Sequence, residues 1–218
     1  MSALSQTRSP HGTPISWCAV VIVLSTSCSG PRKAPGEAGI TPLYDKTSGR
    51  LTELAYDSNH NGKIDTWTEM NGQRPIRTRV DGNEDGRLDR WEYYDEQSKL
   101  VKVGFSRKGD GKADAWAFAD ADGRIQRIEI SSAADDQKID RWEHHGPEGM
   151  RAAEEDTNRN GVVDKWETYE GGVVMTAAFD EDGDGRPDRR LTYSAGTLVS
   201  IESEPDAAGN FAKKVGVR

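Results

Sequence analysis

A phrase built from an Asp-rich loop, a glycine and a tryptophan recurs six times between Asp57 and Arg190. No other feature of the chain constrains the fold as strongly. One copy reads Asp-Gly-Asn-Glu-Asp-Gly-Arg-Leu-Asp-Arg-Trp-Glu over residues 81–92. The copies repeat every 24 to 26 residues, a period set by Trp67, Trp91, Trp116, Trp142, Trp166 and Arg190. A fixed period of this length is typical of repeat proteins.

Each repeat predicts two β-strands. The Trp-containing segment alternates with period two, so that Trp91 and Tyr93 share one side. An aliphatic segment follows after a turn, as in Leu51–Tyr56, Leu100–Phe105, Ile125–Ile130 and Val173–Phe179. Between the end of one 12-residue loop and the start of the next there are only about 13 residues, interrupted by Gly or Pro, which is too few for two helices. We therefore expect an all-β fold, an antiparallel meander of about twelve strands, with closure into a barrel or a solenoid left open. The Asp-rich loops would line one edge and the Gly-rich turns the other.

The N-terminus, residues 1–27, has the pattern of an export signal. Ile15 to Leu24 is an apolar run too short to span a bilayer, and small residues follow it up to Cys28. The segment resembles a bacterial lipoprotein signal, which implies cleavage before Cys28, acylation of that cysteine and, with Ser29 next, an outer-membrane location in the cell envelope. Ser25 stands where such signals usually have a large aliphatic residue. An ordinary secretory signal therefore stays an alternative.

The rest of the chain divides by composition. Residues 28–42 are rich in Gly and Pro, and we expect the lipidated cysteine and a flexible tether there. Residues 43–204 would form the six-repeat β-hairpin domain, and residues 205–218 a partial last hairpin or a C-terminal cap.

Composition limits what can stabilise this domain. Hydrophobic residues make up 34% of the chain and charged residues 30%, so a large apolar core is not expected. Neither cysteine, Cys18 or Cys28, lies in the repeats, which excludes a disulfide there. The net charge of -8 disfavours nucleic acid and anionic lipid as partners. Bound metal is the remaining candidate for a cross-link that stabilises the fold.

The Asp-rich loops are numbered 1 to 6 along the chain, and four of them follow the ligand spacing of an EF-hand calcium loop. Ligands come from positions 1, 3, 5, 9 and 12 and from the carbonyl at position 7, with glycine at position 6. Loop 2 (81–89) and loop 5 (156–164) match at every position when the following glutamate is included. Their candidate ligands are Asp81, Asn83, Asp85, Arg87, Asp89 and Glu92, and Asp156, Asn158, Asn160, Val162, Asp164 and Glu167.

Loop 1 (57–65) and loop 6 (180–188) have Thr68 and Leu191 at position 12, so we expect weaker binding there. Their candidate ligands are Asp57, Asn59, Asn61, Lys63 and Asp65, and Asp180, Asp182, Asp184, Arg186 and Asp188. Loop 3 (106–114) and loop 4 (132–140) have lost the pattern and are expected to bind no metal. They offer Ser106, Lys108, Asp110 and Asp114, and Ser132, Ala134, Asp136 and Asp140.

The phrases D-x-N-x-D-G-x-x-D-x-W-E and D-x-N-x-N-G-x-x-D-x-W-E resemble tandem EF-hand-like calcium-loop repeats of bacterial exported proteins. They share their ligand spacing with dockerin and thrombospondin type 3 loops. The resemblance implies Ca²⁺ as the cofactor. It covers residues 57–188 but is specific only in the loops, since the helices of dockerins and the cysteines of type 3 repeats are missing. The Trp-Glu-x-Tyr phrases are also loosely similar to aromatic-glycine hairpin repeats of bacterial surface proteins.

Several alternatives stay open. Asp, Asn and Gly are common in tight turns, which explains the glycines without metal, although not Asp at position 9 in every copy. The tryptophans could pack one sheet face or stack on sugar rings, and the repetition favours packing. Glu92, Glu143 and Glu167 are copies of one position, which argues against a catalytic constellation. His144 and His145 would face opposite ways on a strand and are not expected to share an ion.

These observations predict a calcium-binding, calcium-stabilised repeat lipoprotein of the bacterial envelope, anchored to the membrane by lipid, that acts as a structural or ligand-binding module. Its protein or glycan ligand is unspecified. A metal-independent scaffold for protein or glycan binding is the alternative, and a carboxylate-based glycan hydrolase is a distant third. We expect no enzyme activity.

Overall fold

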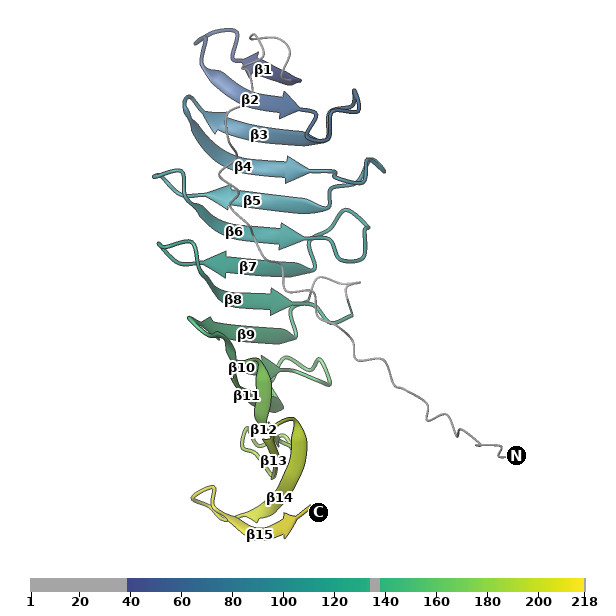
Figure 1. Ribbon diagram of the computed structural model, residues 1–218, viewed down its shortest axis with the longest axis vertical. Coiled ribbons are helices and arrows are strands. Elements are labelled where there is room, and N and C mark those ends of the chain that lie inside the picture. Colours follow the sequence, from purple (N-terminus) through teal and green to yellow (C-terminus); the bar gives the residue numbers. More distant parts are fainter. Residues whose placement is uncertain (1–38, 134–137, 218) are drawn as a thin grey trace, which may run out of the picture. The chain divides into compact units, whose positions relative to one another are not determined.

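The computed structural model describes residues 39–133 and 138–217, and within them it contains one β-sheet and no helix. The strands pair in sequence order, each antiparallel to its neighbours, which confirms the predicted meander (Figure 1). The 15 strands are β1 (Ile40–Tyr44), β2 (Leu51–Tyr56), β3 (Thr66–Asn71), β4 (Arg74–Val80), β5 (Arg90–Tyr94), β6 (Leu100–Phe105), β7 (Ala115–Ala119), β8 (Ile125–Ile130), β9 (Arg141–Gly146), β10 (Gly149–Glu155), β11 (Lys165–Glu170), β12 (Val173–Phe179), β13 (Arg189–Ser194), β14 (Thr197–Pro205) and β15 (Phe211–Gly216).

The strand count exceeds the expected twelve because the sheet extends beyond the repeats at both ends. The six repeats supply β3 to β14, while β1 and β2 precede them and β15 follows. β1 begins at Ile40, inside the segment expected to be tether, and β15 pairs with β14 as a full strand. The predicted segments Leu51–Tyr56, Leu100–Phe105, Ile125–Ile130 and Val173–Phe179 are strands with those same bounds.

The sheet is open. Among the residues that the structure describes, β1 pairs only with β2 and β15 only with β14, so these strands do not close into the barrel that the sequence left as an option. Contacts between strands are confined to neighbours in sequence. Both edge strands carry residues that discourage further pairing: Pro42 lacks an N–H on β1, and Lys213 and Lys214 lie on β15.

One face of the sheet carries all five repeat tryptophans. Residues directly opposite each other in an antiparallel pair share a face, and the register aligns Trp67, Arg79, Trp91, Gly104 and Trp116 in one row. The row continues to Trp142 and Trp166, and we call this side the Trp face. The tryptophans are half-buried. Trp116 lies directly on Gly104, where an added Cβ would be 2.5 Å from the indole ring.

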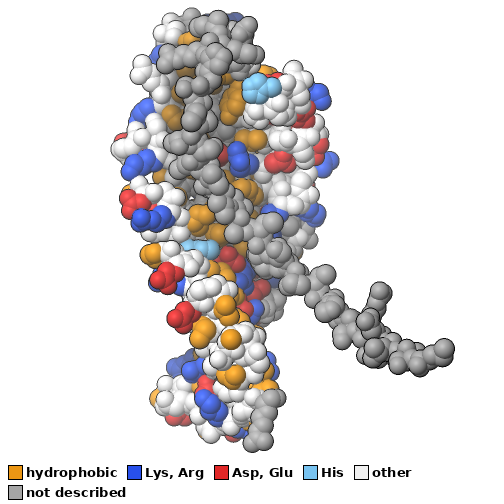
Figure 2. Space-filling view, viewed as in Figure 1, with side chains coloured by type: hydrophobic (Ala, Val, Ile, Leu, Met, Phe, Trp, Pro, Cys, Tyr) orange, Lys and Arg blue, Asp and Glu red, His pale blue; other side chains and the backbone are white. Residues whose placement is uncertain are grey.

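The other side, which we call the Tyr face, carries Tyr94 and Tyr169 together with the small apolar core. The buried hydrophobic residues in the described chain all lie there: Val103, Ala115, Ile130, Ala153 and Ala177. Figure 2 shows hydrophobic side chains along the strands of one face, with charged side chains toward the flanks. Most other buried side chains are polar, and many of them are loop aspartates. The loops therefore matter more for stability than they would beside a large core.

Candidate functional site

The Asp-rich loops lie along one edge of the strands, and the short turns lie along the other (Figure 1). Each loop joins an even-numbered strand to the next odd-numbered strand, as loop 2 joins β4 to β5. The meander therefore places successive loops next to one another. This confirms the predicted separation of loops and turns onto opposite edges.

In each candidate loop, the side-chain oxygens at positions 1, 3 and 5 accept hydrogen bonds from backbone N–H groups of the same loop. In loop 5, the Asp156 carboxylate accepts hydrogen bonds from the N–H groups of Asn160 (3.0 Å) and Gly161 (2.7 Å). Asn158 accepts one from the N–H of Asn160 (3.0 Å), and Asn160 one from the N–H of Val162 (2.8 Å). Glycine at position 6 has a φ of 99° in this loop, a left-handed conformation that suits glycine.

The aspartate at position 9 has a structural role in every loop. In five loops its carboxylate accepts a hydrogen bond from the N–H at position 2: Ser58 to Asp65 (3.0 Å), Gly82 to Asp89 (2.8 Å), Arg107 to Asp114 (3.1 Å), Thr157 to Asp164 (2.9 Å) and Glu181 to Asp188 (2.6 Å). In loop 4 the donor is the N–H of Ser132, at position 1, which lies 2.7 Å from the Asp140 carboxylate. In loops 3 and 4 the position-9 aspartate still accepts such a bond, although positions 1 and 3 have changed to Ser106 and Lys108 and to Ser132 and Ala134. Asp at position 9 therefore closes the loop, whether or not a metal binds.

The charge on this aspartate is compensated differently in the two kinds of loop. In loop 3 the Arg107 guanidinium lies 3.0 Å from Asp114, and Arg159 of loop 5 lies 3.0 Å from Asp140 of loop 4. Within the described residues, the position-9 aspartates of the four candidate loops form no ion pair; these are Asp65, Asp89, Asp164 and Asp188. An arginine thus pairs with the position-9 aspartate in the two loops that have lost the ligand pattern, and no described arginine does so in the four loops that keep it. Neither arginine was singled out by sequence, because neither stands at a ligand position.

Asp81, at position 1 of loop 2, has an unsatisfied buried oxygen. The residue is only 8% exposed, and its Oδ2 accepts a hydrogen bond from the N–H of Gly86 (3.0 Å). Its Oδ1 is buried and has no hydrogen-bond partner among the described residues. A buried carboxylate oxygen without a partner is costly. A cation in the loop would satisfy it, and Asn83 and Asp85 carry side-chain oxygens at the next two ligand positions of the loop.

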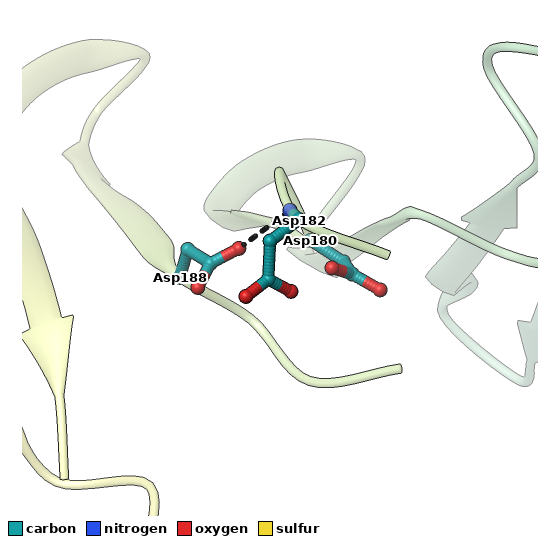
Figure 3. A group of neighbouring side chains, drawn as sticks. All are labelled: Asp180, Asp182 and Asp188. Atoms are coloured by element: carbon teal, nitrogen blue, oxygen red, sulfur yellow. Dashed lines mark hydrogen bonds between the residues drawn. The ribbon is translucent and has the colours of Figure 1, made fainter. Parts of the chain in front are cut away.

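Loop 6 brings three carboxylates together. Asp180, Asp182 and Asp188 each offer an oxygen, and these oxygens lie within 4.8 Å of one another (Figure 3). In the described chain this is the one group of three acidic or metal-binding side chains that meets this distance. A hollow of about 250 Å³ adjoins it, lined also by Asn158, Asn160 and Asp164 of loop 5. The donors are all oxygens, which suits a hard divalent cation.

The structure does not bring Glu92 and Glu167 together with their loops. Glu92 lies opposite Thr78 and Val103 in the sheet, accepts a hydrogen bond from Tyr94 Oη (2.6 Å) and pairs with Arg90 (3.0 Å). Glu167 is held by ion pairs and hydrogen bonds to Lys165, Arg141 and Tyr169, each at 3.0 Å. Three residues along a strand cover roughly 10 Å and end on the opposite face. Position 12 can approach a loop from a helix, but not from this strand.

A ligand-like residue that the sequence pattern missed is Glu84, at position 4 of loop 2. Its carboxylate reaches into loop 1, where it accepts hydrogen bonds from Asn59 (2.8 Å) and Asn61 and pairs with Lys63 (3.2 Å). These contacts lower the pKa of Glu84. Position 4 is not a ligand position within a single loop, so only the stacking of loops reveals this role.

The remaining candidates are held by ordinary partners. Glu143, Glu155 and Glu167 surround Arg141 on the Tyr face at 2.9 to 3.1 Å. His144 lies 3.9 Å from Glu154 and His145 lies 3.6 Å from Glu143. Because the register puts Glu154 on the Trp face and Glu143 on the Tyr face, the two histidines face opposite sides, as expected. Ala134 and Asp136 of loop 4, and Cys28, lie outside the described residues.

Acid should destabilise the loops. Burial alone would raise the pKa of Asp180, but N–H groups of Gly185 and Gly183 donate to its carboxylate and lower that pKa. Asp57 and Asp65 also have lowered pKa values, where burial is outweighed by hydrogen bonds within loop 1. Groups with a depressed pKa in the folded state contribute stability above their unfolded pKa and lose it as the pH falls through the folded pKa.

We therefore expect the free energy of unfolding to be constant near neutral pH. It should decrease as the pH is lowered below the ordinary pKa of aspartate. Urea titrations at a series of pH values down to about pH 3 measure this. Chelator is kept in every sample, so that calcium release does not contribute. A stability that stays constant through the acid range would contradict the prediction.

Comparison with known proteins adds little. No family model and no curated protein matches the sequence. Among solved structures, the chain is similar to one in a crystal structure of accessory secretory protein 1, 2 and 3 from Streptococcus pneumoniae, with 14% sequence identity and a TM-score of 0.37. The match covers 49% of this chain and 19% of the other. In the described part of the chain, no helix has the length and apolar character needed to cross a bilayer.

Proposed function

We propose that the protein is a calcium-stabilised β-repeat module of the bacterial envelope, with cations bound in loops 1, 2, 5 and 6. The contrast in charge compensation carries this proposal. Arginine neutralises the position-9 aspartate in loops 3 and 4, while Asp65, Asp89, Asp164 and Asp188 form no ion pair with any residue that the structure describes. A bound cation would take the place of the arginine.

The donor set favours calcium. The loops offer carboxylate and carboxamide oxygens and one backbone carbonyl, and calcium accepts six to eight such oxygens in flexible geometry. The unpartnered Oδ1 of Asp81 supports a cation in loop 2, and the grouped carboxylates of Asp180, Asp182 and Asp188 support one in loop 6. When bound, the ion supplies positive charge that holds the loop oxygens together. The protein residues orient those oxygens through their own N–H groups.

The proposed location rests on the N-terminal sequence. The lipoprotein-like segment before Cys28 supports export, acylation and attachment to the outer membrane. Calcium outside the cytoplasm is abundant enough to occupy weak sites. The half-buried tryptophans of the Trp face support a scaffold role toward a protein or glycan, with no catalytic step.

Calcium should raise the melting temperature relative to chelator, because an ion that binds only the folded state stabilises it. The double change Asp81→Asn and Asp156→Asn should remove much of that rise, since it weakens two of the loops at position 1. Thermal melts with and without calcium measure the shift, and titration calorimetry measures the binding heat.

The matched control is the double change Asp114→Asn and Asp140→Asn. Both aspartates are 1% exposed and close loops 3 and 4, so the change should lower stability but leave the calcium-dependent shift in place. An unchanged melting temperature together with no heat of calcium binding would refute the calcium proposal. The metal-independent scaffold would then be the better description.

A further inference from the structure

Loop 2 differs from a helical EF-hand loop in what can reach its ion. The unpartnered Asp81 Oδ1 marks where the ion would lie, while Glu92, the residue with the position of the bidentate ligand, lies on the Tyr face. We infer that a calcium ion in loop 2 is held without Glu92 and keeps water in the positions that this glutamate would fill. The inference rests on the proposed function and specifies the ligand shell of one of its sites.

Glu92 is not free to swing into the loop. Its backbone is in register with Thr78 on β4 and Val103 on β6. Its carboxylate bonds Tyr94 Oη at 2.6 Å and Arg90 at 3.0 Å. Bringing the side chain to the loop would break the pairing of β5 with both neighbours. The strand that follows the loop thus fixes Glu92 away from the ion.

The remaining donors leave room for water. Loop 2 can supply side-chain oxygens from Asp81, Asn83, Asp85 and Asp89 and the carbonyl of Arg87. Against the six to eight oxygens that calcium takes, one to three positions remain, on the order of two. Asn83 and Asp85 are exposed, so solvent reaches this side of the loop.

The same reasoning changes the expectation that loops 1 and 6 bind calcium more weakly than loops 2 and 5. Loops 1 and 6 have Thr68 and Leu191 at position 12, where loops 2 and 5 have glutamate. If position 12 contributes nothing on a strand, Thr68 and Leu191 do not weaken their loops. Loop 1 also gains the Glu84 carboxylate from its neighbour.

The test compares Glu92→Gln with Asp81→Asn in the full chain. The Glu92→Gln change is not expected to disturb folding, because a carboxamide oxygen can still accept the Tyr94 hydrogen bond. Calorimetric titration with calcium should show the same number of bound ions for Glu92→Gln as for the unmodified protein, with affinity within about twofold. Asp81→Asn should lose about one ion, or weaken it at least about tenfold.

Terbium, which replaces calcium, gives an independent measure of the shell. Its luminescence decay in H₂O and D₂O reports the bound water, and we expect about one or more water molecules per ion, unchanged in Glu92→Gln. Loss of an ion in Glu92→Gln, or an ion without water in the unmodified protein, would overturn the inference while leaving calcium binding intact. Absence of any calcium or terbium binding to the unmodified protein would instead overturn the proposed function, and this inference with it.

Discussion

Replacing Arg141 by methionine is expected to lower the free energy of unfolding by about 3 kcal/mol or more, because removing one partner of a buried ion pair leaves the other charge uncompensated. The Arg141 side chain is 14% exposed and contacts Glu143 at 2.9 Å, Glu155 at 3.1 Å and Glu167 at 3.0 Å. Burial opposes its charge, yet hydrogen bonds with Glu143, Tyr169 and Glu167 raise the pKa of the Arg141 guanidinium. Urea denaturation followed by tryptophan fluorescence measures the loss.

Lys165 would compensate part of the negative charge that is left when Arg141 is replaced. It pairs with Glu155 and Glu167, but the buried Glu143 would keep only His145, at 3.6 Å, among the described residues. Arg124→Met is the matched control. Arg124 is 70% exposed and pairs with the equally exposed Asp122, so its replacement should cost less than about 1 kcal/mol. Equal losses for the two variants would show that the Arg141 cluster is no stronger than a surface pair.

Gly104→Ala is the second large effect, with an expected cost of about 2 to 3 kcal/mol from overpacking. A Cβ at this position would lie 2.5 Å from Cζ3 of Trp116 and 2.8 Å from Cε3. The indole would have to lift from the strand, which would disturb its contact with Lys102, whose ammonium lies 3.9 Å from its ring centroid. Thermal or urea unfolding gives the cost, and the fluorescence of the folded state should change with the displaced indole.

Gly146→Ala provides the control for glycine replacement in a strand. Its nearest heavy atom to an added Cβ is Arg151 Cδ at 3.8 Å, an ordinary contact, so the change should stay within about 0.5 kcal/mol. In a Trp116→Leu background, Gly104→Ala should lose much of its cost, because the two positions are coupled. If Gly104→Ala lowered the free energy of unfolding in that background as much as in the unmodified protein, the clash would not involve Trp116.

The strands were predictable because their side chains alternate and their ends are marked by turns. Leu100–Phe105 is found with its predicted bounds, and Trp91 and Tyr93 share a face as expected. Asp recurs at position 9 of every loop in the sequence, but the ligand spacing does not predict its hydrogen bond to the N–H at position 2. That bond depends on how the loop folds back on itself.

The candidate site was less predictable where it depends on register and on stacking. Glu92 matches the calcium pattern in sequence, yet a strand carries it to the Tyr face. Glu84 and Arg159 act on a neighbouring loop, and their partners are in another repeat. Such contacts depend on which loops are adjacent in the sheet. The sequence pattern of a single repeat does not contain this information.

Because strands contact only their neighbours in sequence, no central core is shared by the whole sheet. Stability is then close to a sum over adjacent pairs, as in other repeat arrays. A repeat can be duplicated or lost during evolution without disturbing distant contacts, and each one added lengthens the row of tryptophans by about 10 Å, the width of two strands. Repeat number therefore offers a way to adjust how far the protein reaches, independently of how each loop holds together.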